Sequence, residues 1–121
     1  MKDTIFLEGI WERQGDEFAG CSVRVVANSG GLWEGRLVYV TRKAAAAGWI
    51  VGDRKWVDLT PSGPCKFAGR DLQKAYDYAT GEVVRTDYVE KVFRLRERRL
   101  VVRGPRWWDH FGATQEWHKL G

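Results

Sequence analysis

Short segments rich in Val, Ile, Trp, Tyr and Phe recur along the chain, and glycine or charged residues separate them about every 8 to 12 residues. In 4–13, 21–28 and 32–42 apolar side chains alternate with polar ones, which gives each predicted strand one buried face. Asn28-Ser29-Gly30-Gly31 predicts a hairpin between the second and third segments. The first third of the chain is therefore expected to form an antiparallel meander.

The middle of the chain alternates between short strands and less regular stretches. The alanine-rich 43–47 predicts a loop with a single helical turn. The segments 48–51 and 55–59 flank Gly52-Asp53-Arg54, and this pattern predicts a tight hairpin. The next segment, 60–65, contains two prolines and is expected to be an irregular loop.

Residues 71–80 fit two patterns, because their apolar positions match both helical spacing and alternation. We expect a strand, since Thr80-Gly81 can form the turn of a hairpin that leads into a further strand at 83–95.

The last part of the chain predicts two more strands, after a turn at 96–99. The first spans 100–103 and ends at Gly104-Pro105, because proline cannot donate to a central ladder. The second spans 115–120 and turns Trp117 inward.

This pattern of eight to ten short strands predicts a single all-β domain, 1–121, in which the meander closes into a small barrel. Closure removes the two unpaired edges that an open meander leaves. Gly9, Gly35 and Gly48 stand at strand positions and suit the bends of such a barrel. The 7 tryptophans suit its interior, since each can bury about 150 to 250 Å².

Two tripeptides in this pattern resemble signatures of the lipocalin and wider calycin group. Gly9-Ile10-Trp11 is similar to the G-x-W signature of the first strand, and Thr86-Asp87-Tyr88 is similar to the later T-D-Y signature. The resemblance implies a calycin-like barrel whose floor is plugged by Trp11. It also implies a late arginine stacked across that ring, with Arg103 or Arg106 as the candidate, and the T-D-Y tripeptide in a loop near the closed end.

Composition limits the remaining function classes. The chain is 44% hydrophobic and 30% charged, which is typical of a globular domain. No apolar run approaches the roughly 20 residues of a spanning helix, and acids interrupt the N-terminal segment where a secretory leader would need an apolar run. We expect no membrane span, and either a cytoplasmic location or a mature form from which a leader has been removed.

The formal charge of +4 is concentrated in the second half of the chain. Much of the excess lies in the basic hairpin Lys91–Arg106, where the arginines are accompanied by a single acid, Glu97. This hairpin is either a solvated outer face or a surface that binds nucleic acid or protein. Its basic rim consists of Arg94, Arg96, Arg98, Arg103 and Arg106.

Residues capable of catalysis or metal binding are few. Cys21 and Cys65 are too far apart for a CxxC site, and with two histidines they make a poor zinc site, so no metal or cofactor is predicted. His110 follows Asp109 directly, but neighbours on a strand point to opposite faces. A small barrel enzyme that uses His110 or His118 remains an alternative.

The favoured hypothesis is the non-catalytic binding of a small apolar or aromatic ligand inside the barrel, with arginine at the mouth for an acidic head group. The expected lining residues are Trp11, Trp33, Tyr39, Trp49, Trp56, Tyr76, Tyr88 and Phe93.

Overall fold

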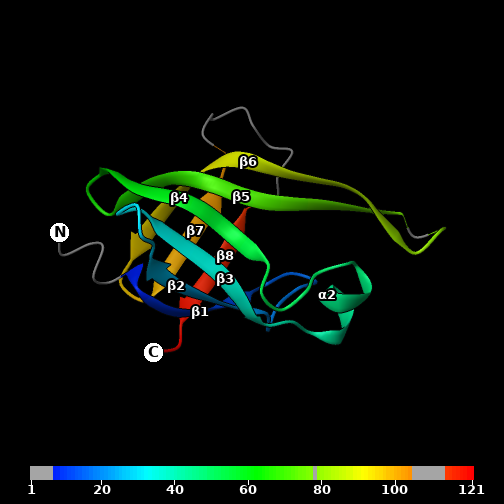
Figure 1. The fold of residues 1–121 in the computed structure, drawn as a ribbon. Coiled ribbons are helices and arrows are strands. Elements are labelled where there is room, and N and C mark those ends of the chain that lie inside the picture. The colour runs from blue at the N-terminus through cyan, green and yellow to red at the C-terminus, as the bar shows by residue number, and fades with distance from the viewer. Residues whose placement is uncertain (1–6, 78, 105–113) are drawn as a thin grey trace.

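The computed structural model describes residues 7–77, 79–104 and 114–121, which form a closed antiparallel barrel of eight strands (Figure 1). The elements are β1 (Gly9–Gln14), β2 (Ser22–Ala27), β3 (Trp33–Tyr39), the short helix α2 (Arg42–Ala46), β4 (Arg54–Gly63), β5 (Lys66–Asp77), β6 (Glu82–Arg96), β7 (Arg99–Arg103) and β8 (Gln115–Lys119). The predicted all-β fold class is confirmed. No helix in these ranges is long and apolar enough to cross a membrane.

Each strand pairs with its neighbour in sequence, and β8 closes the barrel by pairing with β1. In that last ladder Trp11 lies opposite Lys119 and Arg13 lies opposite Trp117. The first and last strands therefore meet, and the predicted inward position of Trp117 is confirmed, since its side chain is fully buried.

Large aromatic side chains fill the interior. The Trp56 ring lies between Phe93 and Trp117, at centroid distances of 5.4 and 5.0 Å and nearly edge-to-face. Each buried tryptophan removes about 150 to 250 Å² from water, which corresponds to about 4 to 6 kcal/mol before the entropy of ordering is subtracted. These rings, with Trp11 and Phe67, are the centre of the core.

The Gly9-Ile10-Trp11 motif begins β1, and it is held by contacts with Leu7 and with the C-terminal Gly121. Gly9 has a φ of 135°, and a Cβ there would lie 2.5 Å from the carbonyl oxygen of Gly121, so only glycine fits. The fully buried Trp11 donates from Nε1 to the Leu7 carbonyl at 2.8 Å. The C-terminal residues thus pack directly against the start of the first strand.

One expectation from the calycin resemblance is wrong, because Thr86-Asp87-Tyr88 lies within β6 and not in a loop. The expected arginine stacked across Trp11 is not Arg103, which is exposed, and the alternative Arg106 lies outside the described residues. Among the described residues, Lys119 of β8 lies beside Trp11, with its Nζ 5.8 Å from the ring centroid.

The predicted strand at 48–51 is wrong, because the segment closes on itself after α2. The Trp49 amide donates to the Ala44 carbonyl, and the Ile50 amide donates to Asp53 Oδ2 at 3.0 Å. Because these amides form hydrogen bonds within the segment, they do not pair with β4. The single helical turn expected just before it is confirmed as α2.

The irregular loop predicted at 60–65 is also wrong, since β4 continues to Gly63. Pro61 pairs with Phe67 of β5, and β3 follows β4 only as far as Leu59. Beyond Leu59 one edge of β4 is unpaired, and proline is tolerated at such an edge because no donor is needed there.

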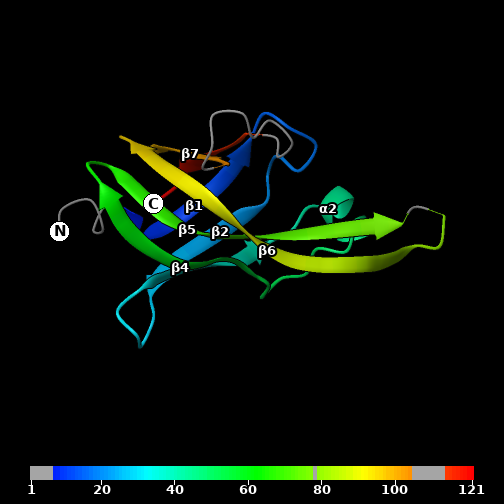
Figure 2. The same ribbon diagram turned by 90° about the horizontal axis from the view of Figure 1, so that it is seen from above.

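The strand expected at 71–80 is confirmed as far as Asp77, and it forms part of a long hairpin. β5 and β6 pair as far as Asp77 and Glu82, whereas β4 follows β5 only to Asp71 and β7 begins to pair with β6 only at Val92. The outer part of the hairpin is therefore a two-stranded arm that extends beyond the barrel past α2 (Figures 1 and 2).

Gly35→Ala tests the packing of the interior. A Cβ at Gly35 would lie 2.6 Å from Val23 Cγ1 and 2.7 Å from Trp56 Cε3, so overpacking should lower the free energy of unfolding by about 1 to 3 kcal/mol, measured by urea denaturation. The matched control is Gly30→Ala in an exposed turn, where the nearest atom is at 3.4 Å and the change should stay within about 0.5 kcal/mol. Equal effects of the two substitutions would contradict this packing.

Candidate functional site

The centre of the barrel is filled. Trp11, Trp56 and Phe93 are fully buried in the packed core. Between Cys21, Leu37 and Trp117 a space of about 10 Å³ remains, which is at the lower limit for a single water molecule. A ligand has no room beside these three residues as the barrel stands.

A larger space opens at the end of the barrel next to α2, and we call it the mouth pocket. Its volume is about 270 Å³. Phe18, Trp49 and Tyr76 supply aromatic walls, and the polar lining comes mainly from Arg13, Lys55, Gln73, Lys74 and Gln115. Aromatic walls around a few convergent polar groups are the usual composition of a small-molecule site.

At the base of the mouth pocket lies a buried ion pair. Lys55 Nζ is 2.8 Å from Asp71 Oδ1, and the two side chains are 3% and 0% exposed. Lys55 also donates to the Leu72 carbonyl at 2.9 Å, and its Nζ lies 4.6 Å from the centroid of the Trp49 ring. The pair is thus tied to both the backbone of β5 and the pocket wall.

Two amides complete the environment of Asp71. Gln73 Nε2 and Gln115 Nε2 donate to Asp71 Oδ2 at 2.6 and 2.9 Å. Gln115 Oε1 accepts in turn from Trp117 Nε1 at 3.2 Å. A continuous set of hydrogen bonds therefore links the base of the pocket to the aromatic core.

Positive charge exceeds negative charge around this pair. The buried Arg13 is paired with Asp16, and Lys74 is paired with Asp53 at 2.7 Å. Lys91 is 6% exposed, shares the inner face of β6 with Phe93, and makes no ion pair or side-chain hydrogen bond with another described residue. Lys91 is therefore a buried cation without a counter-ion among the described residues.

This arrangement perturbs Lys55. Burial lowers the pKa of the Lys55 ammonium below its ordinary value, and the neighbouring cations Arg13 and Lys91 lower it further. The Asp71 carboxylate opposes both effects and does not cancel them. An additional anion close to Lys55 would therefore stabilise its charged form.

The predicted lining residues fall into four groups. Trp49 and Tyr76 line the mouth pocket, and Trp33 is half-buried against the core. Trp11, Trp56 and Phe93 form the core. Tyr39 and Tyr88 are 57% and 37% exposed, and the Tyr88 hydroxyl donates to the Arg54 carbonyl at 2.8 Å.

The polar residues of the mouth were missed, although the alternation carried a signal for them. Arg13 and Gln115 of the mouth stand two residues from the buried Trp11 and Trp117, and the buried Lys91, which lies outside the pocket lining, stands two residues from Phe93. Residues two apart on a strand share a face, so these polar side chains had to enter the barrel. A polar residue on the inner face of a predicted strand is the feature to look for.

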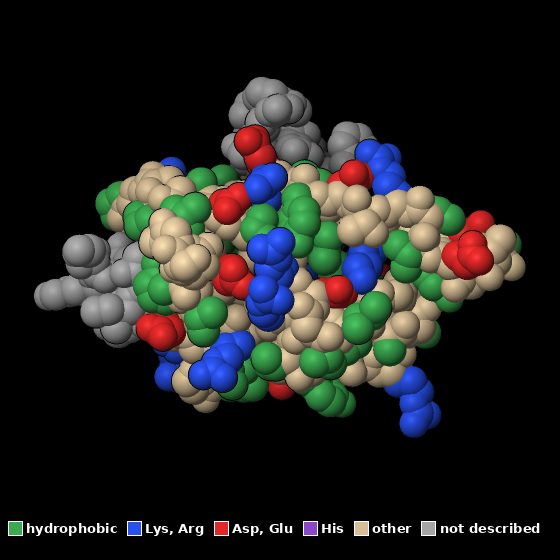
Figure 3. All heavy atoms as spheres, viewed as in Figure 1, with side chains coloured by type: hydrophobic (Ala, Val, Ile, Leu, Met, Phe, Trp, Pro, Cys, Tyr) green, Lys and Arg blue, Asp and Glu red, His purple; other side chains and the backbone are tan. Residues whose placement is uncertain are grey.

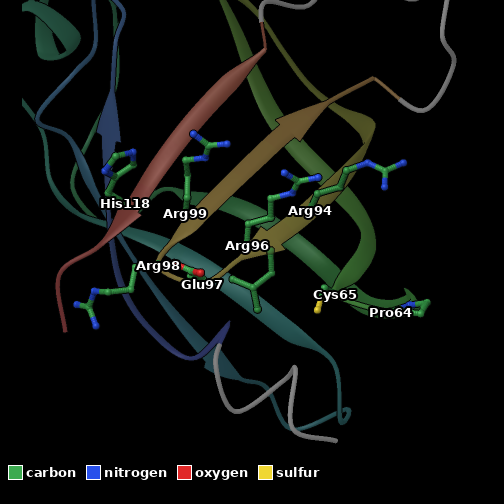
Figure 4. A pocket seen from close by; sticks show the side chains of 9 residues that line it. Pro64, Cys65, Arg94, Arg96, Glu97, Arg98, Arg99 and His118 are labelled. Atoms are coloured by element: carbon green, nitrogen blue, oxygen red, sulfur yellow. The ribbon is translucent and has the colours of Figure 1, made fainter.

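The predicted basic rim lies elsewhere, on the outside of β6, β7 and β8. Arg94, Arg96, Arg99 and His118 project from these neighbouring strands around an open depression of about 760 Å³ (Figure 4), which we call the arginine face. Arg98 is in the turn that borders it. Arg103 is exposed farther along β7, and Arg106 lies outside the described residues.

Charge compensation on the arginine face is incomplete. Arg99 and His118 both reach Glu116, at 3.4 Å, but Arg94 and Arg96 form no ion pair with a described residue. On the face that includes β3 to β5, acidic and basic side chains are interspersed (Figure 3), and ion pairs join Arg36 to Glu34 and Arg70 to Asp58. The arginine face is therefore the more strongly attractive surface for an anion.

The described residues give little support for catalysis or metal binding. Among them no three His, Cys, Asp or Glu side chains gather as a metal site. His118 is exposed beside Glu116, and His110 lies outside the described ranges. Cys21 is buried and Cys65 exposed, and they form no disulfide with each other.

No family model matches the chain, and neither curated proteins nor solved structures show a match to it. The fold and the site therefore rest on the geometry described above.

The ion pair at the base of the pocket can be tested by removing one partner and then both. Lys55→Met should lower the free energy of unfolding by about 3 to 5 kcal/mol, because Asp71 would keep a buried charge without its counter-ion. Lys55→Met with Asp71→Leu should recover at least about 1 kcal/mol of that loss. Urea denaturation measures both. A double variant less stable than Lys55→Met alone would contradict this assignment.

Proposed function

We propose that the protein binds, without catalysis, a small molecule that combines an aromatic or apolar ring with a carboxylate or similar anionic group. The observation that carries the proposal is the mouth pocket, in which aromatic walls surround three cations, Arg13, Lys55 and Lys74, and a single lining acid, Glu17. The sequence predicts a small apolar or aromatic ligand inside the barrel. Because the core is filled, we place the ligand in the mouth pocket instead.

The size of the pocket restricts the ligand. About 270 Å³ is equivalent to about nine water molecules in the liquid, and it is slightly below the usual range for drug-sized ligands. A single ring with one carboxylate, such as benzoate, is of this size. The ring would pack against Trp49 and Tyr76, and the carboxylate would face Lys55 and Lys74.

We also propose that the chain is a distant member of the calycin group. The eight-stranded antiparallel barrel is compatible with that group, and the buried Trp11 at the start of β1 supports the relation. The T-D-Y tripeptide within a strand is a departure from its pattern.

The proposal predicts that Lys91→Met weakens ligand binding while it stabilises the fold. Removal of this uncompensated charge should reduce benzoate affinity at least about fivefold, and it should raise the free energy of unfolding by about 1 kcal/mol. Tryptophan fluorescence on titration with benzoate measures the first effect, and urea denaturation measures the second.

Two controls make this test specific. Arg94→Met also removes one positive charge, but from the arginine face, and it should leave benzoate affinity unchanged. Benzyl alcohol has the same ring without the carboxylate and should bind the unmodified protein more weakly than benzoate. No fluorescence response to benzoate at millimolar concentration, or equal loss in the Lys91 and Arg94 variants, would contradict the proposal.

Benzoate affinity should also depend on pH. The pKa of Lys55 lies below its ordinary 10.5, so this lysine loses its proton at a lower pH than an exposed lysine does. Benzoate binding should therefore weaken as the pH is raised toward 10.5, because the charge that attracts the carboxylate disappears at a lower pH than for an exposed lysine. The same titration at several pH values measures this. An affinity that is constant over the whole range would contradict a role for Lys55.

We propose nucleic-acid binding by the arginine face as a second candidate function, because Arg94 and Arg96 lack carboxylate partners among the described residues. Binding of a single-stranded oligonucleotide, followed by fluorescence anisotropy, should weaken steeply with salt. Arg94→Ala with Arg96→Ala should reduce the slope of log K against log salt by about 2, whereas Arg36→Ala, at an ion-paired position, should not. A salt-independent affinity would exclude this candidate.

A further inference from the structure

The outer part of β6 has an unpaired backbone edge. β5 accompanies β6 from Glu82 to Arg94, but β7 pairs only with Val92–Arg96, and among the described residues no strand covers the other edge of 82–91. In Figure 1 this edge of the arm faces away from β4 and α2. An unpaired strand edge presents free N–H and C=O groups to any second strand of suitable sequence.

This edge carries charged side chains but no proline, which is another common protection of an edge strand. Its apolar residues Val83, Val84, Tyr88 and Val89 are 37 to 63% exposed. Its one irregularity is a bulge near the tip, where Tyr76 lies opposite Val83 and Ala75 opposite Arg85. The ladder from Arg85 inward is regular, so it can accept a further strand.

The sequence of this edge is complementary to itself. Val83-Val84-Arg85-Thr86-Asp87-Tyr88-Val89 has two apolar residues at each end, opposite charges on either side of the centre, and threonine at the centre. When two copies pair antiparallel about a two-fold axis through Thr86, Arg85 of each faces Asp87 of the other. The apolar ends, Val83-Val84 and Tyr88-Val89, then also face each other.

Neighbouring registers lack this match. Directly opposite residues of an antiparallel pair point to the same face of the sheet. In a symmetric pair, one residue must therefore lie opposite its own copy, and the two-fold axis passes midway between them. A centre at Arg85 or at Asp87 would place two identical charges opposite each other. The Thr86-centred register has opposite charges instead, and like charges directly opposite are destabilising.

We propose that the partner of this edge is a second copy of the chain, and that the two copies form a symmetric dimer through their β6 strands centred on Thr86. Arg85 and Asp87 already pair with each other within one copy, and dimer formation shares these charges across the interface. The small contact makes the dimer weak and dependent on concentration. This inference does not depend on the ligand of the mouth pocket.

Substitutions that reverse the charge at Arg85 or Asp87 test both the identity of the partner and the register of the paired strands. Arg85→Asp and Asp87→Arg, each alone, should raise the dissociation constant at least tenfold, because each places like charges opposite each other twice per dimer. An equal mixture of the two variants should dimerise again, since every facing pair is then opposite in charge. Sedimentation velocity over a range of concentrations measures all three samples. A mixture that stays as monomeric as its components, or an unmodified chain monomeric at millimolar concentration, overturns the proposal.

Disulfide trapping gives an independent test of the register. In a Cys65→Ser background, Thr86→Cys should form a covalent dimer on mild oxidation, because the residue faces its own copy. Val89→Cys is the matched control on the same edge, and it should cross-link much less because it faces Val83. Non-reducing electrophoresis reads both. Equal cross-linking of the two variants overturns the Thr86-centred register.

Discussion

The ion pair between Lys55 and Asp71 divides the barrel into two parts. Below it, aromatic rings pack to the exclusion of solvent, and above it lies a pocket lined by charges and amides. Burial of both charges is tolerated because Gln73 and Gln115 bind the carboxylate and the Leu72 carbonyl accepts from the ammonium. These bonds leave the side chains little freedom, so the pocket is largely formed before any ligand arrives.

The energetic cost of this arrangement supports the proposed ligand site. Lys91 adds a buried positive charge that no described anion neutralises, and it further disfavours the charged form of Lys55. A barrel selected only for stability would replace such a residue with an apolar one, as buried charges seldom stabilise a fold. Strain of this kind is common at binding sites, where a ligand supplies the missing interaction.

Much of this fold could be predicted from alternation, because one face of almost every strand is apolar and its period is two. The incorrect predictions at 48–51 and 60–65 have local causes. Asp53 binds the Ile50 amide and so prevents a strand, and Pro61 is tolerated because β4 has an unpaired edge there. The site was harder to find, since its polar side chains come from strands distant in sequence. Only closure brings Arg13 and Gln115 to the same end of the barrel as Lys55.

The charge state of Lys55 tests this account most directly. Its Nζ can be titrated by nuclear magnetic resonance in the folded protein, with and without saturating benzoate. The account predicts a pKa below the ordinary 10.5 in the free protein, and a higher pKa when the carboxylate is bound. A pKa at or above 10.5 in the free protein, with no change on addition of benzoate, would contradict it.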